Sequence, residues 1–316
     1  MANNEIGLET GKCPKCQSSK FRHLYSTPDF LYGVKGQFSV AQCEDCGIQY
    51  QNPRPAPKML GRLYPNDYAP HRDPRTSITR DKAGLLLRVL RALNPLRAHH
   101  HKIGLNPDFV ENGHLIELGC ASGGRLARLR NDGWQNLYGI ELSENAASLA
   151  SAAGFDVRCG LIEDELRKFP DEYFDAVISS MVMEHLYDPF TLIDLVARKL
   201  KPGGQFLFST IVRNSFDARF YGKYWAGYDL PRHMVFYTTD ELESYLSEKF
   251  LVTRVIRQSA YGDFYRSSSW RKAYGEGRLI DKLITSVKPG IFTDILGVMM
   301  AKLNGSCRVS IELRKR

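Results

Sequence analysis

Four cysteines near the start of the chain have the spacing of metal ligands. Cys13 and Cys16 form one C-x-x-C pair, and Cys43 and Cys46 form a second pair, with 26 residues between the two. Zinc binds four thiolates in a tetrahedron, and each pair can supply two of them. Two disulfides are the alternative, but the residues before Cys13 lack the apolar run of a secretory signal. The spacing therefore predicts a structural zinc site, because four thiolates leave no open coordination position.

A second group of residues has the types and spacing of a nucleotide site. The apolar run His114–Leu118 predicts a buried parallel strand, and Gly119 allows a sharp turn after it. Gly123 precedes a predicted helix, whose free N–H groups and positive dipole end would face a ligand. Glu141 ends the next predicted strand, 22 residues after Gly119, where a carboxylate can accept both hydroxyls of a ribose.

The glycine turn discriminates between two kinds of nucleotide cofactor. A dinucleotide site requires a bare glycine at its middle position, where this chain has Ala121. With the acid Glu117 two residues before Gly119, the segment resembles the E/D-x-G-x-G-x-G motif of class I S-adenosylmethionine-dependent methyltransferases, with one departure at Ala121. Glu184-His185-Leu186-Tyr187-Asp188-Pro189 is similar to that family's segment after the fourth strand.

The resemblance implies where the cofactor binds. We expect the backbone from Gly119 to Gly123 to hold its methionine part, Glu141 its ribose, and Leu161 and Ile162 its adenine edge. The family often has an aspartate at the place of Leu161, so adenine recognition here would depend on backbone and apolar contacts. The full set of expected cofactor residues is Glu117, Gly119, Cys120, Ala121, Gly123, Glu141, Leu142, Leu161, Ile162 and Met181.

The remaining sequence fits an α/β fold, a Rossmann-like seven-stranded methyltransferase sheet with a small N-terminal zinc ribbon. Apolar patterning predicts further strands at 155–159, 173–180, after 204, 251–257 and 307–313, with helices at 190–200 and 239–249. In the family the last strand runs antiparallel to the others. The expected domains are a ribbon over 1–51, a proline-rich connector and basic amphipathic helix over 52–104, and a methyltransferase domain over 105–316 with an aromatic insertion at about 212–238.

Composition and charge limit the class of protein. The chain has 316 residues, of which 43% are hydrophobic and 25% charged, and no apolar run of membrane-spanning length. Its formal net charge of +8 is concentrated in residues 71–102. The amphipathic helix 83–93 in that stretch would pack on the core or lie on a membrane surface, and we favour the core. Residues 291–303 leave the same choice, with dimer contact as a third option. The expected location is cytoplasmic, with peripheral membrane contact left open.

The segment between Ser209 and Thr239 is expected to cover the methyl acceptor. Aromatic faces stack on sugars or planar rings, and arginines pair with phosphates. Tyr64, in a "YP-x-x-Y" segment of the connector, would also touch the active site. The aromatic and basic residues of the insertion are Phe216, Phe220, Tyr221, Tyr224, Trp225, Tyr228, Phe236, Tyr237, Arg213, Arg219, Lys223 and Arg232.

His233 is the predicted general base. It closes the aromatic insertion, Pro231 stiffens its approach, and Arg232 would disfavour its charged form. His185 is the rival, although its position after the fourth strand, over the sulfonium, fits a cofactor contact better. A structural role for His233 in the lid remains the plain alternative.

Three functions compete on the sequence alone. The first is methylation of oxygen or nitrogen on a small-molecule or glycan acceptor, such as a sugar, nucleotide-sugar or lipid-linked intermediate, because many similar proteins belong to cell-envelope and polysaccharide pathways. The second, nucleic-acid methylation, lacks the Asn/Asp-Pro-Pro-Tyr/Phe signature after the fourth strand. The third is a binding module without turnover, against which the intact Glu117, Gly119, Gly123 and Glu141 argue. The oligomeric state is not determined by the sequence.

Overall fold

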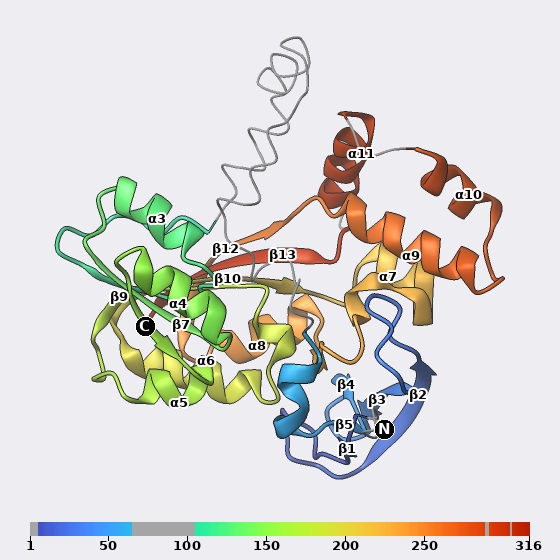
Figure 1. Cartoon of the computed structure of the whole chain (residues 1–316), viewed down its shortest axis with the longest axis horizontal. Coiled ribbons are helices and arrows are strands. Elements are labelled where there is room, and N and C mark those ends of the chain that lie inside the picture. Colours follow the sequence, from blue (N-terminus) through green and yellow to red (C-terminus); the bar gives the residue numbers. More distant parts are fainter. Residues whose placement is uncertain (1–5, 65–104, 288–290, 304) are drawn as a thin grey trace.

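The computed structural model describes residues 6–64, 105–287, 291–303 and 305–316. Seven strands form one sheet in the order β12-β13-β10-β9-β6-β7-β8 (Figure 1). In that order they span Phe250–Arg257, Arg308–Lys315, Leu200–Ile211, Phe174–Ser180, His114–Leu118, Asn136–Glu141 and Asp156–Cys159. Neighbouring strands from β10 to β8 run parallel, and β13 runs antiparallel to both β10 and β12. The predicted methyltransferase sheet is therefore confirmed.

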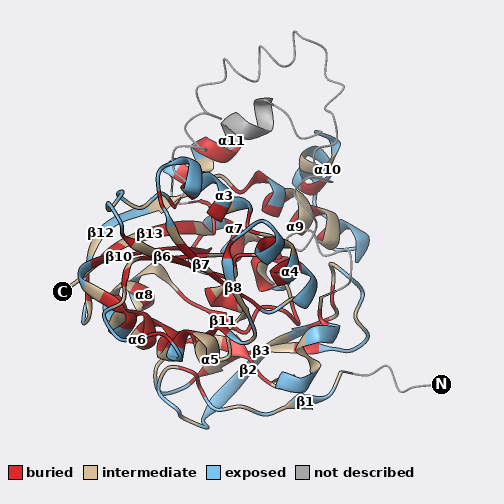
Figure 2. Cartoon of the chain, turned by 60° about the vertical axis from the view of Figure 1, so that its left-hand side comes forward, coloured by how far each residue is buried: buried red, intermediate tan, exposed pale blue. Residues whose placement is uncertain are grey.

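Helices cover both faces of this sheet because its central strands are apolar on both sides. The helices α5 (Ile162–Arg167), α6 (Pro189–Lys199) and α8 (Thr239–Leu246) pack on one face. The helices α3 (Gly124–Asn131) and α4 (Glu144–Ala152) lie on the other. The central strands β6, β7, β9 and β10 are mostly buried, whereas the edge strands β8 and β12 are largely exposed or half-buried (Figure 2).

Local capping explains where the predicted helices begin. The Asp188 carboxylate accepts the backbone N–H of Thr191 at 2.9 Å, and Pro189 occupies the first helical position of α6. At α8, Thr238 and Glu241 form a reciprocal capping box. The strand after α6 begins earlier than expected, because β10 starts at Leu200 and its register shifts before Gln205.

The N-terminal unit shares a sheet with the insertion. Its order is β11-β4-β3-β2, in which β2, β3 and β4 span Phe21–Thr27, Phe38–Cys43 and Gln49–Gln51, and β11 is Val235–Phe236 of the insertion. A short pair of β1 (Leu8–Glu9) with β5 (Arg54–Pro55) precedes the 3-10 helix η1 (Pro57–Arg62). The sheet therefore crosses the expected domain limit at residue 51 and joins the N-terminal unit to the methyltransferase core.

Further helical segments lie on the right-hand side of the view in Figure 1. The insertion contains α7 (Phe216–Tyr221) and the 3-10 turns η4 (Gly222–Tyr224) and η5 (Ala226–Tyr228). Between β12 and β13 the chain forms α9 (Tyr261–Ala273), α10 (Leu279–Ser286) and α11 (Ile291–Lys302). Sequence patterning missed α9 and α10, because α9 has three consecutive serines and no side-chain cap, and its apolar residues do not form one stripe.

Two regions bear on the question of membrane contact. The predicted amphipathic helix 83–93, the basic residues of 71–102 and the connector beyond Tyr64 lie outside the described residues. In α11, Val298 and Ala301 are buried against the rest of this chain, whereas Met299 is exposed. Among the described helices, none has the length and apolar character needed to cross a membrane.

Candidate active site

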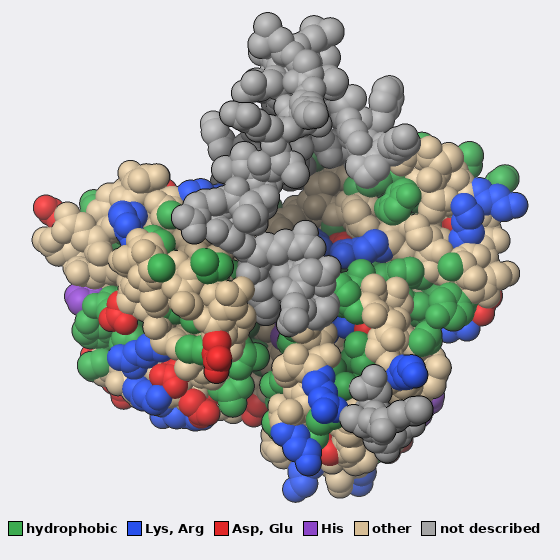
Figure 3. All heavy atoms as spheres, in the orientation of Figure 1, with side chains coloured by type: hydrophobic (Ala, Val, Ile, Leu, Met, Phe, Trp, Pro, Cys, Tyr) green, Lys and Arg blue, Asp and Glu red, His purple; other side chains and the backbone are tan. Residues whose placement is uncertain are grey.

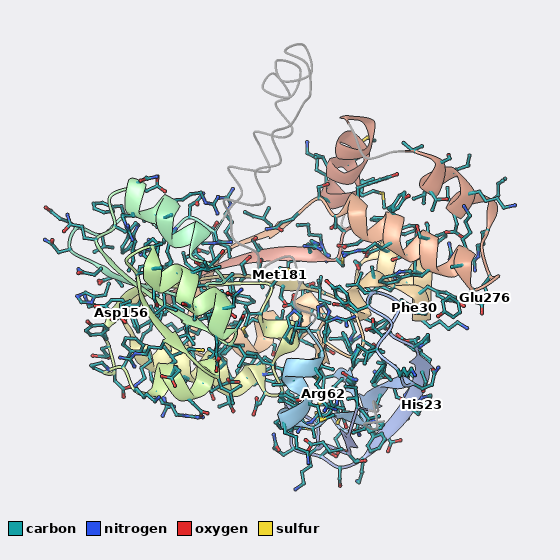
Figure 4. The ribbon with its side chains drawn as sticks, in the orientation of Figure 1. His23, Phe30, Arg62, Asp156, Met181 and Glu276 are labelled. Carbon is teal, nitrogen blue, oxygen red and sulfur yellow. The ribbon has the colours of Figure 1, made fainter. Side chains whose placement is uncertain are left out.

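A cavity of about 860 Å³ opens at the carboxyl ends of the parallel strands. Gly119 after β6 and Glu141 at the end of β7 line one end, and Met181 after β9 lies in the middle (Figure 4). Ile211 at the end of β10 and Arg308 at the start of β13 line the other end. Ligands of open α/β sheets bind at this edge.

The turn after β6 requires glycine for steric reasons. Gly119 has a φ of +73°, and a Cβ there would lie 2.6 Å from Val182 Cγ2. Gly123 has a φ of +82° and packs so closely on Phe155 that a Cβ would approach its ring to 3.1 Å. Ala121 keeps the left-handed conformation, with a φ of +49°, despite its methyl group. The turn thus brings backbone N–H groups and the start of α3 close to the cavity.

Glu141 is held where a ribose carboxylate is expected. One carboxylate oxygen accepts the N–H of Ala121 at 2.9 Å, and the other accepts the N–H of Ser143 at 2.8 Å. Leu142 and Leu161 line the same end and expose 44% and 46% of their surface, so both offer apolar area to a planar base. Ile162 at the start of α5 lines it as well. These residues fit the nucleoside of S-adenosylmethionine.

Three of the expected cofactor residues lie behind the cavity lining. The Glu117 carboxylate forms an ion pair with Arg125 at 3.0 Å, and burial raises the pKa of Glu117 to about 7. The thiol of Cys120 packs against Gly139, where a Cβ would come within 2.5 Å of the sulfur. Gly123 lies at the end of the turn. Glu117, Cys120 and Gly123 therefore support the turn, whereas Gly119 and Ala121 line the cavity.

Met181 occupies a strained position in the middle of the cavity. Its φ of +55° is in the left-handed region, which a long side chain rarely adopts. Its N–H donates to the Ser209 carbonyl at 2.8 Å, which ties the end of β9 to β10. Ordinary patterning contains no signal for this conformation, which directs the chain from β9 into the 3-10 turn η3 (Met183–His185).

His185 and His233 contact each other, and both line the cavity. Their rings pack edge to face with centroids 4.5 Å apart. The Nδ1 atom of His233 lies 2.8 Å from the Gly227 carbonyl, and Nδ1 of His185 lies 3.2 Å from the Arg232 carbonyl. Because a carbonyl only accepts, the neutral rings carry their hydrogens on Nδ1, which leaves a lone pair on each Nε2.

Burial makes the His185 ring a weak base. Burial, assisted by the neighbouring His233, lowers the pKa of His185 to about 3, so His185 is neutral and weakly basic. Its Nδ1 also lies 3.1 Å from the Tyr64 hydroxyl, so the part of the connector that the structure describes reaches the site as expected. Beside it, Glu184 is fully buried and accepts from the Thr210 hydroxyl at 2.8 Å.

Arg232, which precedes His233, is bound by acids rather than left as a free charge. The Arg232 guanidinium is fully buried and bound by two carboxylates, Asp29 at 2.7 and 2.8 Å and Asp229 at 2.7 and 3.1 Å. Its charge is therefore neutralised. The carboxylate of Asp229 also lies 3.8 Å from Nε2 of His233.

The aromatic insertion does not supply the acceptor surface that its composition suggested. Its eight expected rings do not line the cavity. Most of these rings pack with each other and with other apolar residues in a separate hydrophobic core. The expected phosphate-binding residues are also engaged elsewhere: Arg213 pairs with Glu241 at 2.5 Å, and Lys223 with Glu276 at 2.8 Å. From the helical part of the insertion, only Ala226 and Gly227 reach the cavity.

The acceptor end is instead lined by segments far apart in the sequence. Leu31 and Tyr32 come from the loop after β2, and Asp263, Arg266 and Trp270 come from one face of α9. Phe30 stacks on Trp270 at 5.3 Å between ring centroids and so joins that loop to α9 (Figure 4). Asp263, Arg266 and Trp270 are spaced i, i+3 and i+7, so they share one face of a helix. This spacing could have predicted their shared position only if the helix itself had been predicted.

The four N-terminal cysteines converge as predicted. Their sulfur atoms all lie within 4.8 Å of one another, with 3.5 Å between Cys13 and Cys46 and between Cys16 and Cys43. Zinc–sulfur bonds of about 2.3 Å in a tetrahedron place sulfur atoms about 3.8 Å apart, which is close to this arrangement. The donor set therefore fits a structural zinc ion.

Comparison with known proteins agrees with this geometry. Ubiquinone biosynthesis O-methyltransferase of Hydrogenovibrio crunogenus is 34% identical over 132 residues, which is 40% of this chain and 53% of that protein. The mitochondrial enzyme of the same name from Dictyostelium discoideum is 29% identical over 140 residues, 39% of this chain and 44% of that protein. The chain thus spans about half the length of the curated relatives it matches.

A solved structure shows the same fold. Geranyl diphosphate C-methyltransferase from Streptomyces coelicolor A3(2) aligns with a TM-score of 0.50 and 15% identity, over 80% of this chain and 89% of that one. The model of a family described as "Methyltransferase domain" matches residues 89–249, just over half of the chain. The chain therefore belongs to this family, and it is an S-adenosylmethionine-dependent methyltransferase with the class I fold.

Proposed function

We propose that the protein transfers a methyl group from S-adenosylmethionine to a hydroxyl of a small-molecule acceptor. One continuous cavity carries this proposal, because its lining includes both Glu141 at the cofactor end and His233 and Trp270 at a second end. Class I methyl transfer needs such an arrangement, since the nucleophile must lie in line with the S–CH₃ bond. The relatives named O-methyltransferases support oxygen as the acceptor atom.

Each part of the cavity would have a different role in the reaction. The cofactor supplies a methyl group made electrophilic by its sulfonium. Glu141 and the Gly119 turn would bind and orient the nucleoside and methionine parts, and Met181 would lie beside the sulfonium. His233 would accept the hydroxyl proton on Nε2, because Gly227 fixes the opposite nitrogen as the donor. The low pKa of His185 makes it a poor base near neutral pH, so we assign it a positioning role.

The acceptor class is the finer part of the proposal. A sugar, nucleotide-sugar or lipid-linked intermediate remains our sequence-based candidate, and the rings of Tyr32 and Trp270 offer faces for a sugar or a planar ring. Nucleic acid is less well supported. On the face drawn in Figure 3, the Lys and Arg side chains of the described surface are scattered, and those on the lower left lie among Asp and Glu.

Zinc, location and membrane contact complete the proposal. We infer that one zinc ion bound by Cys13, Cys16, Cys43 and Cys46 holds the N-terminal unit together, and that its role is structural. A cytoplasmic location remains a prediction from the sequence, with peripheral membrane contact left open. The zinc site bears on function indirectly, because the N-terminal unit also contributes Leu31 and Tyr32 to the cavity.

Cofactor binding tests the assignment most directly. Glu141→Ala should weaken binding of S-adenosylhomocysteine by about 10- to 150-fold in calorimetry, which corresponds to about 1.5–3 kcal/mol for hydrogen bonds to a charged group. Asp156→Ala, which changes an exposed acid on the neighbouring strand β8, is the matched control and should bind normally. Unchanged binding in Glu141→Ala, or tight NAD binding by the wild type, would contradict the cofactor site.

Transfer of label tests the acceptor. Labelled S-adenosylmethionine would be incubated with the wild type and, in parallel, catechols, nucleotide-sugars, lipid-linked glycans and total RNA. Label in a small hydroxylated acceptor or glycan supports the proposal. Label in RNA alone would show that the second function considered from the sequence is the correct one.

A further inference from the structure

The acceptor end of the cavity has an unusual pair of arginines. Arg308 begins β13 and pairs across the sheet with Ile211 at the carboxyl end of β10. Arg266 reaches the same cavity end from α9. The strand order separates them from Glu141 on β7 by the strands β10, β9 and β6. They therefore lie on the acceptor side of Met181, away from the expected cofactor.

The two guanidinium groups share a single carboxylate. Asp263 accepts Nε and Nη2 of Arg308 at 2.7 and 3.1 Å, and it also accepts Nη2 of Arg266. Although burial alone would raise it, the pKa of Asp263 is held below its usual range by Arg308 and Arg266, so this carboxylate is ionised. Two positive charges and one negative charge leave a net charge of +1 in this cluster.

Several other charged side chains around the cavity have direct ion-pair partners. Arg54 pairs with Glu9 at 3.3 Å, and Arg167 with Asp164 at 3.2 Å. Asp229, at the same end as the arginine pair, is bound by Arg232. Burial raises the pKa values of the nearby acids Glu184 and Asp217, which favours their neutral forms. Glu184 accepts from Thr210, and Asp217 accepts from Trp225 and Ala218. Direct ion pairing among the described residues thus leaves the excess positive charge at Arg266 and Arg308.

The arginine pair also retains unused donors. Nε of Arg266 is buried and has no hydrogen-bond partner among the described residues. A buried donor without a partner costs about 1–3 kcal/mol, so native structures seldom retain one without a ligand or water to satisfy it. The side chains of Arg266 and Arg308 are still 40% and 32% exposed, so both can contact a molecule in the cavity.

We propose that Arg266 and Arg308 bind an oxyanion, carboxylate or phosphate, carried by the methyl acceptor. Guanidinium groups bind both oxyanions through paired, charge-assisted hydrogen bonds, which fix orientation as well as affinity. The anion would be anchored on the far side of Met181 from Glu141, and the rings of Tyr32 and Trp270 would flank the body of the acceptor. Its role as an acceptor anchor depends on the proposed function, but its affinity for anions does not.

Calorimetry with pairs of charged and neutral probes tests the subsite. The protein, saturated with S-adenosylhomocysteine, would be titrated with 3,4-dihydroxybenzoate against 3,4-dihydroxybenzamide, and with glucose 1-phosphate against glucose. At least one charged probe should bind tenfold or more tightly than its neutral counterpart. Preference in the first pair identifies a carboxylate, and preference in the second a phosphate. Equal binding within both pairs would overturn the inference.

Variants assign the preference to these side chains. Arg266→Gln and Arg308→Gln should each reduce the charged-over-neutral preference to below about threefold, whereas Arg254→Gln, on the exposed side of β12, should retain it. Because Arg308 also anchors Asp263, thermal melting is measured in parallel. If Arg308→Gln unfolds, the result of Arg266→Gln decides, and a preference retained in a folded Arg266→Gln variant would overturn the inference.

The outcomes also separate this inference from the proposed function. Anion preference without transfer to any small acceptor would support the subsite and contradict the proposed function. Efficient transfer to neutral acceptors, with no preference for charged ones, would support the proposed function and contradict the anion subsite.

Discussion

The buried triad Asp29–Arg232–Asp229 provides a sharp test of how the N-terminal unit and the active site are coupled. Asp29 belongs to the loop after β2, and Arg232 immediately precedes the predicted base, 203 residues away. Both side chains of this pair have 0% exposure. Asp29 also accepts the backbone N–H groups of Leu31 and Tyr32, which line the cavity. Asp29→Asn keeps the shape of the side chain and removes its charge.

The expected cost follows from these contacts. Breaking a buried ion pair by removing one partner typically costs about 3–5 kcal/mol, because the other charge is left uncompensated. Arg232 still retains Asp229, so we expect the low end of that range, about 3 kcal/mol. The entropy of unfolding is about 2.1 cal/mol/K per residue, so about 0.7 kcal/mol/K for this chain, and the melting temperature should fall by about 4–5 °C.

Differential scanning calorimetry measures this shift. The control is Lys223→Gln, which breaks an exposed ion pair with Glu276 and should change the melting temperature by less than about 1.5 °C. A double-mutant cycle of Asp29→Asn with Arg232→Gln should give a coupling energy above about 1 kcal/mol. If Asp29→Asn melts within 1 °C of the wild type, the triad does not join the two units as we infer.

Three further predictions concern the metal, a buried acid and the base. Metal analysis of freshly purified reduced protein should find one zinc per chain; Cys46→Ser should lose it and Cys159→Ser, outside the cluster, should retain it, whereas zinc-free wild type would contradict the site. Because the pKa of Glu117 is raised from 4.5 to about 7 by burial, its stabilising protonation is lost as pH rises through that window, so Glu117→Gln should match the wild type near pH 5 and melt above it at pH 8. A variant equally stable relative to the wild type at both values would refute this. At saturating cofactor, His233→Ala should lower turnover by about a hundredfold or more with near-normal cofactor affinity, and His185→Ala by less; near-normal turnover in a folded His233→Ala variant would exclude it as the base.

Short-range patterns were sufficient for most of the fold. The glycine turn after His114–Leu118, the acid at Glu141 and a helix beginning near Phe190 each depend on residues close together in the chain, and each was predicted from the sequence. The cysteine pairs are also short-range features, because each C-x-x-C pair needs only a local hairpin. Zinc prefers four thiolates, so the two pairs together predict one site. Local steric and capping rules determine such features before any tertiary contact forms.

Charge and aromatic content were poor guides to the acceptor end. The rings of the insertion and Arg232 looked like ligand-binding groups by type, but burial assigned them to a core and a salt bridge. No local signal distinguishes an aromatic residue that packs from one that binds, because both need the same apolar surface. Arg266 and Arg308 do reach the cavity. They lie on α9 and β13, and the sequence alone did not indicate that these two elements meet at the acceptor end.

The sequence by itself determined the class of the protein, the cofactor turn and the cysteine cluster, because these follow from residue type and spacing over short distances. Only the tertiary structure decided what lines the acceptor end. Tyr32, His233, Arg266 and Arg308 come from four segments that meet only when the N-terminal sheet pairs with β11 and α9 packs beside it. Contacts across such sequence separations depend on the packing of whole elements, which one sequence does not encode as a local pattern.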